Sequence, residues 1–344
     1  MDRKITVIAA AIVAAAAIAA GVIFTTGALT STQQNNINDD GNTINNTTLT
    51  TEDGNDKLKI IASFFPLYDF ARHVGGDKAE VSSLIPIGIE PHDWEPTAQN
   101  VVAVQDADMF IFNGAGFEGR WISQIEPNFK VDTSKGIQLL EGGRGGEHEG
   151  EGEGGEQQQL VQQGTAVSDP HIWLDPVLAK HQVGVIRDAF VEVDPENASY
   201  YRDNAVRYIS ELESLDASIK SELSSNCTLK DFISFHDAFS YFANRYNLTQ
   251  HSIHGVSPEG EILPQRITEI RDLATQLGID TIYSEDLVDP RLATVIANEI
   301  PNGRVLILSP IEGIDREELD QGVGYIQKMR ENLENLKIGL KCQL

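Results

Sequence analysis

The sequence predicts an α/β protein of two lobes, each built on a mainly parallel sheet, with one long rigid helix between them. Short β-rich runs alternate with helical patterns from Lys57 onward, which is typical of βα units around a parallel sheet. The alternation occurs in two sets, and a long amphipathic stretch separates them. The 344 residues have room for about two domains of ordinary size. We therefore expect a first lobe at residues 57–193, a linking helix at 194–225 and a second lobe at 226–344.

The elements of each lobe are bounded by residues that begin or end helices. Gly75 and Gly76 can end one helix, and Thr97 can cap the next. In the first lobe we expect strands at residues 59–63, 79–85 and 109–113, and helices at 67–74, 97–106 and 118–125. In the second lobe we expect strands at 231–235, 281–284 and 304–308, and helices at 238–246, 264–277 and 290–300, with a last helix ending near 340.

The linking helix has a clear start and a continuous apolar stripe. Asp194 and Pro195 supply an N-cap and a first-turn proline. A helix of about 30 residues would be ~45 Å long. One helix is stiffer than a pair of flexible strands, so the lobes should tilt rather than clamp. The stripe consists of Tyr201, Ala205, Tyr208, Leu212, Leu215, Ile219 and Leu223.

The first 56 residues predict export. Residues 5–29 carry no charge and could span roughly 37 Å as a helix, enough for a membrane anchor at 1–29 with its N-terminus inside. A cleaved signal peptide is the alternative, and either leaves the rest of the chain outside the cytoplasm. No cysteine near this run could carry a lipid. Residues 30–56 are rich in Asn, Thr and Asp, which predicts a disordered tether.

Composition narrows the possible partners. The net charge of −26, from 52 acidic and 26 basic residues, argues against binding nucleic acid or anionic membranes. Cys227 and Cys342 are too few for a thiolate metal site, so a metal would need histidines and carboxylates. Export would let these two cysteines form a disulfide; the alternative is two unrelated thiols. Residues 141–164 are acidic and glycine-rich with one histidine, His148, and predict a solvated or cation-collecting loop.

Three histidines are the candidate metal ligands. His92, His171 and His236 lie in expected loops beside aspartate, glutamate or proline, and His236 directly follows its strand. Ligands of open α/β sheets bind beyond the carboxyl ends of strands. Neutral imidazoles suit zinc, and neighbouring carboxylates can accept the second ring N–H. Zinc affinity should therefore fall below about pH 6, near the ordinary imidazole pKa of ~6.5.

The other histidines have simpler interpretations. His73 is expected in the last turn of a helix, where positive charge is favourable, and His181 on a helix surface. His251 and His254 are three residues apart in an expected loop. They either have no function or form a second metal site.

From about Lys57 to its end, the chain resembles the zinc- and manganese-binding solute-binding proteins of ABC uptake transporters. Four motifs occur in the order of that family: PHDWEPT at 91–97, DPHIWLDP at 169–176, FHDAFSYF at 235–242 and GVSPEGE at 255–261. The resemblance implies a metal in the cleft between two lobes, with His92 and His171 from the first lobe and His236 from the second. Zinc-type members have histidine at the third position and manganese-type members glutamate, so zinc is expected, with manganese or iron as the alternative.

The fourth ligand is expected to be Glu312. Many relatives have aspartate where this chain has Ser309, but some zinc-type relatives have a Pro-Ile/Leu-Glu segment with that glutamate on the metal. Residues 306–308 have the pattern of a buried strand, so Glu312 lies in the loop beyond its carboxyl end. Glu285, Asp286 or a water are the alternatives.

The resemblance implies a non-enzymatic function. The chain would capture Zn²⁺ outside the cell and deliver it, as a monomer, to an ABC transporter permease with a separate ATPase subunit. A G-x-G-x-x-G match at 114–119 is a dinucleotide-binding alternative, but Glu118 would face the pyrophosphate. A zinc hydrolase is a second alternative, yet three histidines and a carboxylate leave no open position for water. A surface adhesin of the same fold is a third.

Overall fold

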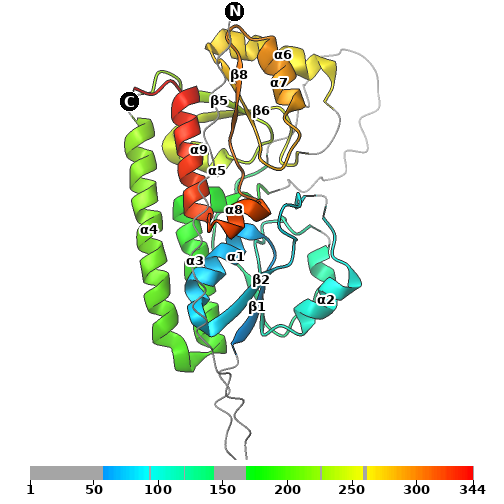
Figure 1. Ribbon diagram of the computed structural model, residues 1–344, viewed down its shortest axis with the longest axis vertical. Helices are drawn as coiled ribbons and strands as arrows, with labels where there is room; N and C mark the ends of the chain where they lie inside the picture. The colour runs from blue at the N-terminus through cyan, green and yellow to red at the C-terminus, as the bar shows by residue number, and fades with distance from the viewer. Residues whose placement is uncertain are drawn as a thin grey trace, which may run out of the picture. The chain divides into compact units, whose positions relative to one another are not determined.

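The computed structural model describes residues 57–92, 94–119, 121–142, 168–224, 227–258 and 262–343, which contain two four-stranded parallel sheets (Figure 1). The expected anchor at 1–29, the tether at 30–56 and nearly all of the acidic loop at 141–164 lie outside these residues. No helix in the described part of the chain is both long and apolar enough to cross a membrane.

The first sheet has the strand order β2-β1-β3-β4, with every pairing parallel. Its central strands are apolar on both faces because helices cover both sides, as the buried run Met109, Phe110 and Ile111 of β3 illustrates. The elements are β1 (Leu58–Ala62), α1 (Phe65–Gly75), β2 (Ala79–Ser83), α2 (Ala98–Gln105), β3 (Met109–Phe112), β4 (Lys130–Asp132) and α3 (Pro176–Val193). Thr97 caps α2 by accepting the backbone N–H of Asn100, as predicted.

The helix expected at 118–125 is wrong. Only a short 3-10 helix, Trp121–Gln124, forms there. Gly114 and Ala115 have φ of 78° and 54°, so the chain makes a tight loop instead. The carboxylate of Glu118 holds this loop, accepting the N–H groups of Asn113 at 2.7 Å and Gly114 at 3.1 Å. The same contacts occupy donors that a dinucleotide phosphate would need, which argues against the dinucleotide alternative.

The second sheet has the strand order β6-β5-β7-β8 and is also parallel. Two expectations are wrong. The segment of His251 is the edge strand β6, whose polar residues carry no strand pattern, and not a loop. The 306–308 run is not a buried strand, because it belongs largely to the half-exposed edge strand β8. The elements are β5 (Asp231–Ser234), α5 (Ser240–Tyr246), β6 (Thr249–Ser252), α6 (Pro264–Leu277), β7 (Thr281–Ser284), α7 (Arg291–Asn298), β8 (Arg304–Ile307), α8 (Arg316–Asp320) and α9 (Tyr325–Gly339).

The long helix α4 (Ala198–Ser224) joins the lobes and runs alongside α3 and α9 (Figure 1). Asp194 accepts the Asn197 N–H at the start of a short 3-10 turn that leads into α4. Every residue of the predicted apolar stripe is buried. The two-lobe α/β fold with its long helix is therefore confirmed. The predicted disulfide is also confirmed: Cys227, just after α4, is bonded to Cys342, just after α9.

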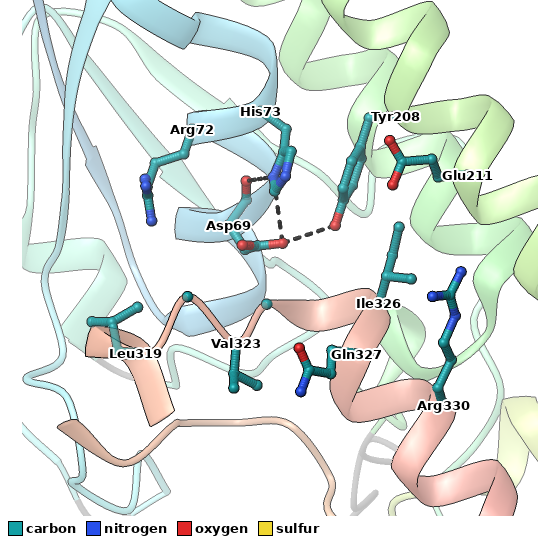
Figure 2. A pocket seen from close by; sticks show the side chains of 12 residues that line it. Asp69, Arg72, His73, Tyr208, Glu211, Leu319, Val323, Ile326, Gln327 and Arg330 are labelled. Atoms are coloured by element: carbon teal, nitrogen blue, oxygen red, sulfur yellow. Dashed lines mark hydrogen bonds and ion pairs between the residues drawn. The ribbon is translucent and has the colours of Figure 1, made fainter. Parts of the chain in front are cut away.

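A buried carboxylate joins the helices α1, α4 and α9. Asp69 of α1 accepts the hydroxyl of Tyr208 on α4 at 2.8 Å and the first N–H of α9, from Tyr325, at 3.3 Å. Figure 2 shows the Asp69 carboxylate below His73 and Tyr208 and in contact with both, and the rings of these two residues stack on each other. A cavity of about 460 Å³ lies beside this junction. Asp69 of the first lobe is thus bonded to the start of α9, the last helix of the second lobe.

Asp69→Ala should lower the free energy of unfolding by about 2–4 kcal/mol, because two buried donors lose their acceptor. Asp69→Asn is the matched control: its carbonyl oxygen can still accept both bonds, so the loss should be smaller. Urea unfolding followed by circular dichroism measures both. An unchanged midpoint and slope for Asp69→Ala would contradict the assigned role.

Candidate metal centre

Four polar side chains from loops of both lobes converge in the described structure. His92 follows β2, His171 precedes a 3-10 turn (Ile172–Leu174), His236 follows β5, and Glu312 follows β8. Each offers one ligand atom, and these atoms all lie within 4.8 Å of one another. His171, His236 and Glu312 are buried, whereas the side chain of His92 is 11% exposed. Within the described residues this is the one cluster of three or more such groups.

Two carboxylates turn two of the imidazoles inward. Asp169 Oδ1 accepts both the backbone N–H of His171, at 3.0 Å, and its ring Nδ1–H, at 2.7 Å. Glu285 Oε1 does the same for His236, at 3.1 and 2.7 Å. Because each carboxylate accepts a hydrogen bond from Nδ1–H, the Nε2 atom of each ring faces the cluster, where it can present its lone pair to a cation. Glu285, the alternative fourth ligand, therefore lies behind His236.

The separations of Glu312 from the three imidazoles, and of His171 from His236, fit a tetrahedral ion. The Nε2 atoms of His171 and His236 are 3.2 Å apart. Glu312 Oε1 lies 3.1 Å from Nε2 of both His92 and His171, and 3.5 Å from that of His236. Ligands about 2.0–2.1 Å from a tetrahedral zinc are about 3.3–3.4 Å from one another. The second oxygen of Glu312 is buried without a hydrogen-bond partner, which leaves the carboxylate free to shift onto a cation.

His92 is held differently from the other two histidines. Its backbone N–H donates to Glu90 Oε1 at 3.2 Å, and its ring lies edge-on to Phe117 at 5.6 Å. Burial and the nearby Glu312 raise the pKa of Glu90 to about 8, despite the hydrogen bond from His92. The loop of His92 is thus anchored by its backbone and by an aromatic contact.

The charges of the cluster depend on one another. Burial alone would lower the pKa of both His171 and His236. Hydrogen bonds to Asp169 and Glu312 nevertheless raise the pKa of His171. The charges of Glu285 and Glu312 raise the pKa of His236 well above its usual range. Burial likewise would raise the pKa of Glu312, yet the neighbouring imidazoles hold it well below its usual range. The metal-free cluster therefore favours protons on His171 and His236, and a cation must displace those protons.

The other four histidines that the structure describes do not join this centre. His73 Nδ1 contacts the Asp69 carbonyl, and His181 Nε2 contacts the Lys135 carbonyl. His251 pairs with Asp231 at 2.9 Å, and the His254 ring packs against Phe235. The structure does not bring His251 and His254 into a cluster of three ligands among the residues it describes.

A family model described as zinc-uptake complex component A, periplasmic, matches residues 60–339. The chain belongs to this family. The family is one of extracytoplasmic solute-binding proteins rather than enzymes. The high-affinity zinc uptake system protein ZnuA of Bacillus subtilis is 36% identical over 297 residues, which are 85% of this chain and 90% of ZnuA.

Two further relatives belong to streptococci. The zinc-binding protein AdcA of Streptococcus pyogenes is 34% identical over 290 residues; these are 82% of this chain and 56% of AdcA, so this chain spans little more than half of that relative. The Zn(II)-bound ZnuA-like domain of Streptococcus pneumoniae AdcA superposes with a TM-score of 0.69 at 31% identity, covering 83% of this chain and 99% of that domain.

The raised pKa values of His171 and His236 change the expected pH dependence of Zn²⁺ binding. A group with a raised pKa in the metal-free state is already protonated above pH 6.5, and that proton competes with the ion. Zinc affinity should therefore begin to fall at a higher pH than the ~6 expected from ordinary imidazoles, and binding at pH 7 should release protons. Calorimetry in buffers of different ionisation enthalpy measures this release. No release at pH 7, with affinity constant down to pH 6, would contradict the charge assignment.

Proposed function

We propose that this protein captures Zn²⁺ outside the cell with His92, His171, His236 and Glu312 and delivers it to an ABC transporter permease. The observation that carries the proposal is the convergence of three imidazoles and one carboxylate within 4.8 Å, with near-tetrahedral separations among His171, His236 and Glu312. Membership of a zinc-uptake family and likeness to a Zn(II)-bound domain support it.

The donor set favours zinc over manganese and iron. Three imidazole nitrogens suit a borderline cation, whereas manganese prefers carboxylate, carbonyl and water oxygens. For one set of nitrogen and oxygen ligands, divalent zinc also binds more tightly than manganese or iron. His236 is the decisive residue, because a glutamate in its place would supply a second oxygen.

The same donor set accounts for binding without catalysis. Four protein ligands complete a tetrahedron, and a catalytic zinc needs an open position for water. Glu312 fills that position from the buried side of the cluster. The ion is therefore cargo, and ATP hydrolysis belongs to a separate subunit of the transporter.

Several features of the working protein are part of this proposal. We place the lobes at 57–193 and 226–344, on either side of the helix at 194–225. The chain acts as a monomer, and its segment 1–29 anchors it to the outer face of the cytoplasmic membrane through the tether at 30–56. A cleaved segment would instead release the protein.

The His92→Ala, His236→Ala double variant should lose most of its zinc affinity, because two of four ligands are absent. The matched control is the His73→Ala, His181→Ala double variant, which removes two imidazoles outside the cluster. Competition with a chromophoric chelator measures affinity in the full chain, with Mn²⁺ as a competing ion. The unchanged protein and the control should bind one Zn²⁺ that Mn²⁺ does not displace.

Unchanged zinc binding in the His92, His236 variant would overturn the proposed site. Displacement of zinc by an equal concentration of Mn²⁺ would overturn the proposed metal.

A further inference from the structure

The residue before Glu312 has an unusual backbone. Ile311 is fully buried and has a φ of 57°, in the left-handed region that a β-branched residue rarely adopts. Such strain persists only where surrounding contacts impose it, and it collects at functional sites. The turn at Ile311 is what directs the next side chain, Glu312, back toward the three imidazoles.

The hydroxyl of Ser309 stabilises this turn through two hydrogen bonds. It accepts the N–H of Ile311 at 3.1 Å and donates to Asp286 Oδ2 at 2.7 Å. Asp286 is fixed in turn by the ammonium of Lys328, at 3.0 Å. Burial would lower the pKa of Lys328, but Asp286 and Glu318 outweigh it, so the pKa is raised and the ammonium stays charged.

A second side chain of α9 fixes the backbone of the same residue. Asn332 accepts the N–H of Ser309 at 2.8 Å and donates to its carbonyl at 2.7 Å. Lys328 and Asn332 are four residues apart and so lie on one face of the helix. Both are buried. Asn332 therefore holds both backbone polar groups of Ser309 directly, and Lys328 holds its side chain through Asp286.

We infer that Asp286, Ser309, Lys328 and Asn332, here called the α9 clamp, form the positioning device that aims Glu312 at the metal. The inference rests on the proposed zinc site and adds to it. Ser309 stands where the family resemblance would place an aspartate ligand. In this chain its hydroxyl is engaged by Asp286 and Ile311, so it acts on the metal only through the loop that carries Glu312.

The first-lobe side of the loop is held separately. Trp173 donates its indole N–H to the carbonyl of Pro310 at 2.7 Å. This bond fixes the middle of the loop but does not touch the Ile311 N–H, so the clamp has a task that Trp173 cannot perform.

The test is a double-mutant cycle of zinc affinity in the full chain, with Ser309→Ala, Glu312→Ala and both together. Ser309→Ala should weaken zinc binding about 10- to 100-fold, the usual effect of removing a partner of a metal ligand. The double variant should bind no more weakly than Glu312→Ala, because the clamp acts only through that residue. Thr281→Ala is the matched control, since it removes a buried hydroxyl from the far end of β7 and should leave zinc affinity unchanged.

The outcomes separate this inference from the proposed function. Failure of the unchanged protein to bind zinc would overturn the proposed function itself. Normal zinc binding by Ser309→Ala, or a double variant whose loss is the sum of the two single losses, would overturn the clamp alone. If Ser309→Ala does not fold, Lys328→Met replaces it in the same cycle with Glu312→Ala. The losses of zinc affinity are again expected to be non-additive. Additive losses would contradict the clamp.

Discussion

The candidate metal centre depends on two carboxylate–imidazole pairs, Asp169 with His171 and Glu285 with His236. Each carboxylate fixes the orientation of its ring, so the two Nε2 atoms face each other 3.2 Å apart in a buried space. Such an arrangement is unfavourable unless a proton or a cation lies between the nitrogens. The negative charge of Glu312 stabilises either the proton or the cation. The site is thus organised before the metal arrives, which limits the reorganisation that binding requires.

This organisation places demands on the rest of the chain, because the ligands come from both lobes. The loop of Glu312 leaves the second sheet but is bonded to Trp173, two residues from His171. The hydroxyl of Tyr325, at the start of α9, donates to the carbonyl of Trp173 at 2.5 Å. These contacts and the long helix α4 tie the lobes together beside the site. Any separation of His92 and His171 from His236 and Glu312 would therefore have to loosen these contacts.

The sequence predicted those parts of the fold that local pattern determines. The stripe of α4 and the apolar strands β3 and β7 were readable because burial selects their residues directly. Strand β6 was missed because its polar residues, at the sheet edge, carry no apolar alternation. The helix at 118–125 was predicted wrongly because the Glu118 carboxylate holds a loop there, a contact that no local propensity encodes.

In the candidate site, too, some residues could be predicted from the sequence and others could not. Three histidines in expected loops and, with the help of the family resemblance, one glutamate could be selected from the sequence, and the structure brings them together. The roles of Glu285 and of the α9 clamp could not be predicted, since they depend on pairings between loops and a helix. The left-handed Ile311 even opposes its own propensity, which is typical of a functional site imposed by tertiary contacts.

X-ray absorption at the zinc edge of the loaded protein tests the central claim most directly. The account predicts three imidazole nitrogens and one carboxylate oxygen at about 2.0–2.1 Å, with the outer-ring scattering that imidazoles produce. A spectrum with five or six light-atom ligands, or with fewer than three imidazoles, would contradict it.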